Sequence, residues 1–143
     1  MEDDKVLIED PRMRPLPRPG AALERPCTDA IWSEGPVWWE DGAVTRSGFD
    51  VVDGRYPRNG RVFAVIEPGL SDGFRLDADG NLFTSSADGI QVYAPDGTRL
   101  GKIVVPEVIS NCTFGGPDRS TLFITASTSP SSIELATRGS VLP

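Results

Sequence analysis

Three Asp-Gly pairs, at residues 79–80, 88–89 and 96–97, separate short apolar segments in the second half of the chain. Glycine adopts the positive φ of a primed turn without strain, so each pair predicts a β-hairpin. The apolar segments begin about every 8 to 12 residues, a spacing typical of sandwiches and propellers. We expect strands at 61–67, 74–77, 81–86, 90–94, 102–105 and 121–126. Because no window shows the repeat of an amphipathic helix, the chain is predicted to be all-β.

The composition fits this prediction. The chain has 143 residues, enough for one ordinary domain, and 38% of them are hydrophobic. Fifteen glycines and 13 prolines favour many short strands over long helices. Four of the prolines (Pro11, Pro15, Pro17 and Pro19) fall among residues 1–20, which are predicted to form an extended arm or edge segment without helix or inner strand. Residues 21–143 would form the β unit.

Charge and residue types exclude several functions. The formal net charge is −7, with only two lysines, which argues against binding to nucleic acid or to an anionic membrane. The chain has no histidine, so a Ser-His-Asp triad, a Cys-His dyad and a histidine-bound zinc are all excluded. The acidic N-terminus does not resemble a signal peptide, and no apolar run is long enough to span a membrane. We therefore expect a soluble, cytoplasmic protein.

Two further patterns have simple structural interpretations. Cys27 and Cys112 form no CxxC motif and are expected to be buried free thiols. The spacing of acidic residues over 77–88 resembles a calcium loop, but Leu82 stands where the sharp turn of that loop needs glycine. We therefore favour a hairpin turn at 77–81.

Two carboxylates lie at tight backbone features. Glu34 precedes Gly-Pro, and Asp72 precedes a glycine at the start of a predicted strand. Strand entrances lie on the rim of a β architecture, where loops build sites, and oxygen ligands select hard cations such as Ca²⁺, Mg²⁺ or Mn²⁺. From spacing alone, the alternative that both residues merely form turns stays open.

At these residues the sequence resembles the SMP-30/gluconolactonase/LRE (regucalcin-like) family. The matching segments are WSEGPVW (32–38), DGFRLDADGNLF (72–83), GIQVYAPDG (89–97), LGKI (100–103), FGG (114–116) and TLFITAS (121–127). The resemblance covers about residues 21–41 and 48–129, and it is the order of the segments that makes it specific. It implies a six-bladed β-propeller with antiparallel four-stranded blades that hydrolyses sugar lactones with a divalent cation in its central channel.

The resemblance also assigns residues. It implies that Glu34 and Asp72 are metal ligands and that Asp72 is in addition the catalytic base. The cation would be Ca²⁺ first, with Zn²⁺, Mn²⁺ or Mg²⁺ as alternatives, and the partner a small sugar lactone. The asparagine ligand of the family has no counterpart, because Asn59, Asn81 and Asn111 lie in segments that match the family elsewhere.

The length predicts only part of a ring. At about 40 to 45 residues a blade, the chain supplies about half of a six-bladed propeller. The middle blades are missing, with a deletion seam near residues 42–48, and Pro130-Ser-Ser is expected to interrupt the strand after Ser129. Open blade edges would favour self-association. We therefore expect a sugar lactone hydrolase impaired by this loss or, alternatively, a non-catalytic propeller fragment that binds divalent metal weakly.

Overall fold

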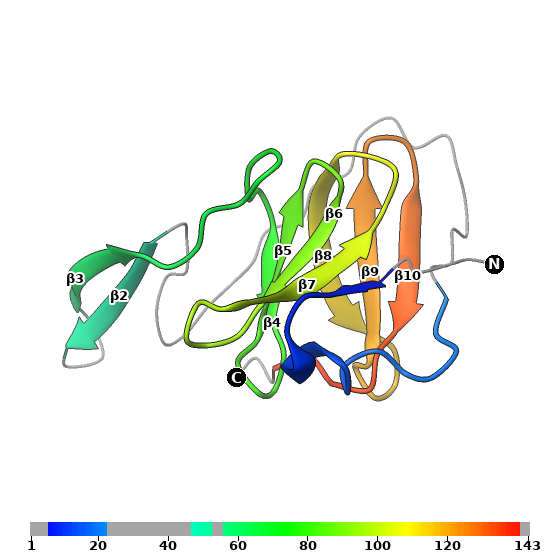
Figure 1. Cartoon of the computed structure of the whole chain (residues 1–143), viewed down its shortest axis with the longest axis horizontal. Coiled ribbons are helices and arrows are strands. Elements are labelled where there is room, and N and C mark those ends of the chain that lie inside the picture. The colour runs from blue at the N-terminus through cyan, green and yellow to red at the C-terminus, as the bar shows by residue number, and fades with distance from the viewer. Residues whose placement is uncertain (1–5, 23–46, 53–55, 141–143) are drawn as a thin grey trace.

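A computed structural model describes residues 6–22, 47–52 and 56–140 of the chain (Figure 1). The described part contains strands and one short 3₁₀ turn, which confirms the prediction of an all-β chain. In chain order the elements are β1 (Val6–Ile8), η1 (Pro11–Met13), β2 (Ser47–Val52), β3 (Tyr56–Val62), β4 (Phe74–Leu76), β5 (Leu82–Ser86), β6 (Gly89–Tyr93), β7 (Arg99–Val104), β8 (Ile109–Gly115), β9 (Thr121–Ala126) and β10 (Pro130–Glu134).

The larger sheet has the strand order β1-β7-β6-β5-β4, and all its neighbouring strands are antiparallel. Strands β4 to β7 follow one another directly, so the three hairpins predicted from the Asp-Gly pairs are confirmed. Gly80 and Gly97 reach φ values of 81° and 85° in two of these turns. Glycine adopts this left-handed conformation far more readily than other residues, which is why the pairs locate the turns so well.

The smaller sheet has the order β10-β9-β8 and is also antiparallel. The expectation that Pro130-Ser-Ser interrupts a strand is wrong, because Pro130 is the first residue of β10 and lies opposite Thr125 of β9. Proline is tolerated there because β10 pairs with β9 on one side only among the described strands. Ser131 and Ile133 are both buried. Because one of these two core positions holds a serine, the sequence does not show the alternation of apolar and polar residues that indicates a strand.

The main core lies between the two sheets. The rings of Phe83 on β5 and Phe114 on β8 meet edge to face, with their centroids 5.2 Å apart. Aliphatic side chains from both sheets surround this pair, together with two residues of the N-terminal segment. The cluster includes Met13, Leu16, Ile90, Val92, Leu100, Ile103, Leu122, Ile124, Ile133 and Leu135.

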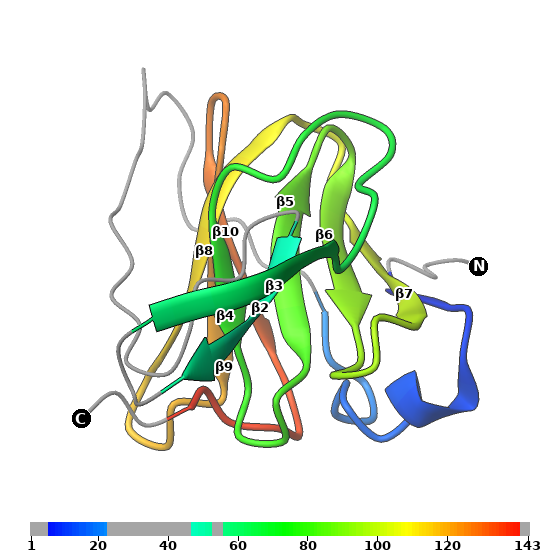
Figure 2. The same ribbon diagram turned by 90° about the vertical axis from the view of Figure 1, so that its left-hand side faces the viewer.

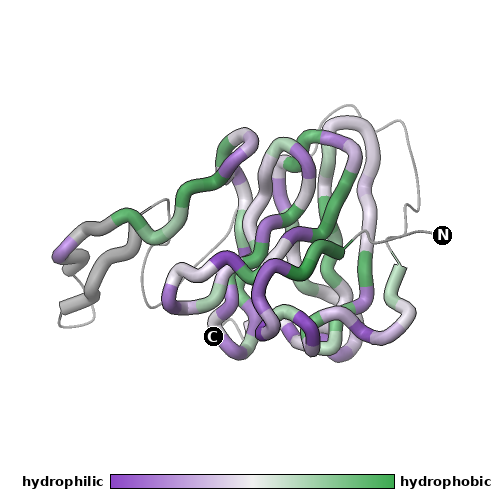
Figure 3. The backbone as a smooth tube through the Cα atoms, in the orientation of Figure 1, coloured by the Kyte–Doolittle hydropathy of each residue, from purple (hydrophilic) through white to green (hydrophobic). Residues whose placement is uncertain are grey.

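A second, smaller cluster lies on the opposite face of the larger sheet, where the connection from β3 to β4 crosses it. Ala64 and Ile66 are buried there, and Val65 between them is exposed. The prediction of a strand over the whole of 61–67 is wrong, because β3 ends at Val62 and residues 63–67 form no strand. The hydroxyl of Tyr93 donates to the carbonyl of Val65 over 3.1 Å. Figure 3 shows the hydrophobic character of this connection, and Figure 2 shows the β2–β3 hairpin in front of the larger sheet.

The proline-rich N-terminal segment packs onto this body. Strand β1 pairs with β7 at the edge of the larger sheet, and η1 buries Met13 in the main core. The prediction that the prolines exclude any helix is wrong for this one turn. Pro11 occupies its first position, where a missing N–H costs nothing and the fixed φ of proline suits the turn.

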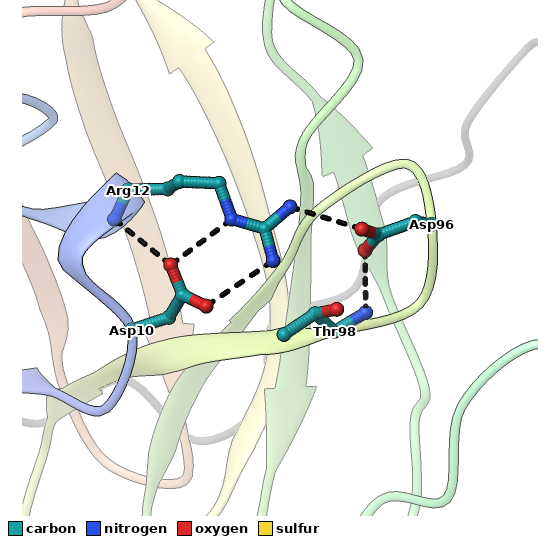
Figure 4. Close-up of polar contacts among 4 residues, drawn as sticks. All are labelled: Asp10, Arg12, Asp96 and Thr98. Carbon is teal, nitrogen blue, oxygen red and sulfur yellow. Dashed lines mark hydrogen bonds and ion pairs between the residues drawn. The ribbon is translucent and has the colours of Figure 1, made fainter.

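One charged cluster fastens this segment to the β6–β7 turn (Figure 4). The guanidinium of Arg12 donates to both carboxylate oxygens of Asp10, over 3.0 and 3.1 Å, and to Oδ2 of Asp96 over 3.0 Å. The backbone N–H of Thr98 donates to Oδ1 of Asp96 over 2.9 Å. Both this hydrogen bond and Arg12 hold the pKa of Asp96 down, at about 2.

Candidate functional site

The candidate site is the short segment that leads into β4, residues 71–73, together with the strand ends that hold it. Two backbone N–H groups of this segment, those of Asp72 and Gly73, donate to the hydroxyl oxygen of Ser85 over 2.8 and 3.1 Å. In return the backbone N–H of Ser85 donates to the carbonyl of Gly73 over 2.9 Å. Beside this pair, the hydroxyls of Ser71 and Thr84 are hydrogen-bonded at 2.6 Å. The end of β5 therefore fixes the backbone of Asp72.

Strand β8 holds the same segment from the other sheet. The N–H of Gly73 also donates to the carbonyl of Ser110 over 2.8 Å. A Cβ built on Gly73 would lie 2.1 Å from Oδ1 of Asn111 and 2.8 Å from its Cα. Only glycine fits at this close approach, which places the side chain of Asn111 directly beside the residue that follows Asp72.

The carboxylate of Asp72 is left available by this arrangement. Asp72 is exposed, and among the described residues none donates a hydrogen bond to its side chain or forms an ion pair with it. An exposed carboxylate on a fixed backbone can accept a proton from water or bind a cation. This is the chemistry that the sequence predicted for Asp72.

The second predicted ligand, Glu34, lies outside the described residues, as do Cys27 and most of the seam near residues 42–48. Its approach to Asp72 therefore stays a prediction. Within residues 6–22, 47–52 and 56–140, no three acidic or cysteine side chains gather closely enough to hold a metal ion. The described residues alone thus do not fit a complete cation site, and Asp72 would supply one ligand of it.

Asp77, at the other end of β4, has a purely structural position. Its residue is 1% exposed, and Oδ1 accepts from the backbone N–H groups of Asp79 and Asn81 over 3.0 and 2.8 Å. Oδ2 accepts from the side-chain amide of Asn81 and from the hydroxyl of Thr137, over 2.8 and 3.0 Å. The predicted hairpin turn at 77–81 is confirmed, because residues 77–81 connect β4 to β5 and the carboxylate of Asp77 accepts from backbone N–H groups of that turn.

Cys112 has no chemical part in this site. Cys112 is 3% exposed and is a free thiol. Its S–H donates a hydrogen bond to the carbonyl of Phe83 over 3.6 Å. Burial raises the pKa of this thiol to about 12. A thiol that stays protonated at neutral pH is neither a good nucleophile nor a good metal ligand, so the expectation of a buried free thiol is confirmed for Cys112.

A groove of about 460 Å³ lies elsewhere, between the N-terminal segment and the smaller sheet. Arg18 crosses it to within 3.6 Å of Glu134 and donates to the carbonyl of Leu135 over 2.9 Å. Its lining comes from residues 18–22, β9 and β10, and includes no residue of the 71–73 segment. The groove is therefore separate from the Asp72 site.

Sequence reasoning located Asp72 but missed the residues that fix it. Ser85 and Thr84 are fully buried hydroxyls in a strand, and a serine or threonine in a sequence gives no sign of which backbone group it will bond. Asn111 was placed outside the metal site by its sequence context, and the structure places it against Gly73. The signals that located Asp72 were the glycine that follows it, Gly73, and the family motif that contains both residues.

Comparison with known proteins now adds to this geometry. Residues 43–128 match the family described as SMP-30/Gluconolactonase/LRE-like region. The chain therefore belongs to the SMP-30/gluconolactonase/LRE-like family, as the sequence motifs predicted.

Two curated relatives are lactonases. A gluconolactonase of Zymomonas mobilis is 49% identical over 61 residues, which cover 41% of this chain and 17% of the relative. The pentonolactonase XacC of Haloferax volcanii is 38% identical over 90 residues, which cover 60% of this chain and 31% of the relative. The chain thus spans less than a third of the length of either relative.

A solved structure supports the fold. The calcium-binding protein regucalcin of Agrobacterium tumefaciens superposes with a TM-score of 0.57 at 21% identity, over 67% of this chain and 41% of that one. At this identity the likeness concerns the arrangement of strands. Separately, the described part of the chain holds no helix with the length and apolar character needed to cross a membrane.

Proposed function

We propose that this chain carries part of the catalytic site of a sugar lactone hydrolase, with Asp72 as its catalytic carboxylate. The observation that supports this most directly is the geometry of Asp72, whose backbone is fixed by Ser85 while its side chain is exposed and free of described partners. The two lactonase relatives, a gluconolactonase and a pentonolactonase, give the substrate class. Both relatives are named as lactonases, and sugar lactones are cyclic esters.

Asp72 would act as the general base in this reaction. Water adds to the lactone carbonyl and the ring C–O bond breaks, which yields an open-chain hydroxy acid. Asp72 would orient the attacking water and accept its proton, and that proton would pass to the ring oxygen as it leaves. Because the backbone of Asp72 is fixed before substrate arrives, less conformational freedom of this residue has to be lost on binding.

A divalent cation is a separate part of the proposal. The family resemblance implies Glu34 and Asp72 as its ligands, with Ca²⁺ first and Zn²⁺, Mn²⁺ or Mg²⁺ as alternatives. The name of the Agrobacterium neighbour, a calcium-binding regucalcin, agrees with this order. Such a cation would polarise the lactone carbonyl when bound. Two carboxylates are a small part of the at least six oxygen ligands that calcium takes, so we expect weak binding by this chain.

The architecture would be part of a propeller. We propose that β4 to β7 form one four-stranded blade and that β8 to β10 belong to the next, with the middle blades of the ring absent. Incomplete blades leave strand edges and apolar side chains uncovered, and Val62 and Val65 are 71% and 66% exposed. We therefore expect a low rate of hydrolysis and self-association of the chain, which light scattering after gel filtration would reveal as a mass above one chain.

The deciding experiment is turnover of gluconolactone, followed by acid release, with and without Ca²⁺, Mn²⁺ and Zn²⁺. Asp72→Ala should abolish turnover by the chain. Asp118→Ala is the matched control, because Asp118 is also exposed but lies in the turn between β8 and β9, at the far end of β8 from the Asp72 site. Turnover that survives in Asp72→Ala would refute the role given to this carboxylate.

A second candidate function is a non-catalytic fragment that binds divalent metal weakly. The observation that favours it is the absence of any group of three metal-binding side chains among the described residues. Its signature would be a rise in melting temperature on addition of Ca²⁺ that is lost in Asp72→Ala, with no lactone turnover in either protein.

A further inference from the structure

We infer that Ser85 is a positioning residue for Asp72, so that the direction of the Asp72 carboxylate depends on a hydroxyl buried in the neighbouring strand. The inference concerns the backbone of Asp72 directly, and its meaning for catalysis rests on the proposed function. Ser85 is 0% exposed, and no sequence motif singles it out.

The hydroxyl oxygen of Ser85 uses both of its acceptor positions on this segment. It accepts from the N–H of Asp72 at 2.8 Å and from the N–H of Gly73 at 3.1 Å. These two groups stand on either side of the Asp72 Cα. Holding both fixes the backbone around that atom, and with it the direction of the Cα–Cβ bond that carries the carboxylate.

The two N–H groups depend on Ser85 to different degrees. Gly73 has a second acceptor, the carbonyl of Ser110 at 2.8 Å, and is further confined by the side chain of Asn111. For Asp72, the Ser85 hydroxyl is the partner that the structure gives its N–H among the described residues. Removal of this hydroxyl should therefore loosen Asp72 while Gly73 stays in place.

The next residue of the strand provides a matched control. Ser86 is 1% exposed, and its hydroxyl oxygen lies 3.1 Å from Oδ1 of Asp88 and 2.9 Å from the carbonyl oxygen of Gly89, either of which can accept its one proton. These bonds lie in the β5–β6 turn and do not reach residues 71–73. Ser85→Ala and Ser86→Ala thus each remove one buried hydroxyl from β5, but only the first touches Asp72.

The test compares these two variants of the full chain by two measurements. Amide hydrogen exchange, resolved by NMR, reports on the Asp72 N–H directly. Lactone turnover reports on the carboxylate. In Ser85→Ala we expect amide exchange at Asp72 to be about tenfold faster and kcat to be about tenfold lower, because one hydrogen bond is lost. KM should be nearly unchanged. In Ser86→Ala both quantities should equal those of the wild type.

The outcomes separate this inference from the proposed function. Unchanged exchange at Asp72 in Ser85→Ala overturns the inference, and so does an unchanged kcat in an active protein. Equal effects in Ser86→Ala also overturn it, because they would reflect general loosening of β5. If the wild type and all variants lack lactone turnover, the proposed function fails, and exchange at Asp72 alone then decides whether Ser85 fixes this residue.

Discussion

Asp72 and Asp77 lie at the two ends of β4. Asp72 lies just before a bend of the backbone at Gly73, and Asp77 begins the turn between β4 and β5. Asp77 is buried, and its carboxylate accepts four hydrogen bonds from Asp79, Asn81 and Thr137. Asp72 is exposed, and the bonds that hold it reach its backbone N–H and leave its carboxylate free of described partners.

The contrast shows how one residue type serves structure at one end of a strand and is available for chemistry at the other. A carboxylate that already accepts four hydrogen bonds from the protein contributes stability and has little capacity for a ligand. A carboxylate on a backbone fixed by other groups contributes little stability and keeps its capacity. The sequence shows an aspartate at each end of the strand, and burial and the hydrogen-bond partners distinguish the two.

The largest effect should come from removing Asp77. Asp77→Ala leaves the N–H groups of Asp79 and Asn81 and the hydroxyl of Thr137 without their acceptor, so we expect a loss of about 3 kcal/mol in the free energy of unfolding. Urea denaturation measures this. Asp77→Asn keeps one carbonyl oxygen for the backbone donors and should lose clearly less. Equal losses in the two variants would contradict the hydrogen-bond explanation.

Gly73→Ala should come next. The added Cβ would lie 2.1 Å from Oδ1 of Asn111, so the two strands must separate locally, and we expect a loss of roughly 2 kcal/mol. In an Asn111→Ala background the loss should shrink, because the contact with Oδ1 is removed while the one at 2.8 Å from the Cα stays. A double-mutant cycle in urea tests this coupling. Independent effects would mean that Asn111 does not confine Gly73.

Asp72→Ala should change stability by no more than about 0.5 kcal/mol, because its side chain is exposed and makes no contact with described residues that folding would require. Parallel urea curves for the wild type and Asp72→Ala check this. A loss as large as that in Asp77→Ala would show that the two ends of β4 do not differ as described.

The smallest effect concerns Asp96, an exposed aspartate that differs from both. Its pKa falls from 3.8 to about 2 in the folded chain, because Thr98 and Arg12 favour its charged form. A lowered folded-state pKa stabilises the fold above about pH 4, and this contribution is lost as the pH falls to about 2. The melting temperature of the wild type should thus exceed that of Asp96→Ala at pH 5, and the difference should vanish near pH 2. A constant difference would refute this assignment.

Much of the larger sheet was predictable because its turns are specified locally. An Asp-Gly pair needs only its own backbone preference to form a hairpin, and β4 to β7 followed from three such pairs. The smaller sheet was harder. Strand β8 has no such pair before it, and β10 carries a buried serine, Ser131, where an apolar residue would have shown the alternation. Its pairing with β9 is a hairpin closed by residues 127–129, which contain no Asp-Gly pair to mark the turn.

The site could be predicted only in part for the same reason. Asp72 was identified because its neighbour Gly73 and the family motif lie beside it in the sequence. Ser85 and Asn111 reach it from β5 and β8, across hydrogen bonds and close contacts that connect distant parts of the chain. Glu34 lies outside the described residues, so its predicted place beside Asp72 stays a prediction.

The packing of the N-terminal segment determines where this protein can be truncated without loss of its core. The family match covers residues 43–128, but Met13 and Leu16 before it and Ile133 and Leu135 after it belong to one cluster with Phe83 and Ile124. A polypeptide trimmed to the matched stretch would lose β1 and β10 together with these side chains. The stretch that identifies the family is therefore smaller than the unit that folds, and a boundary drawn around it would pass through the middle of the core.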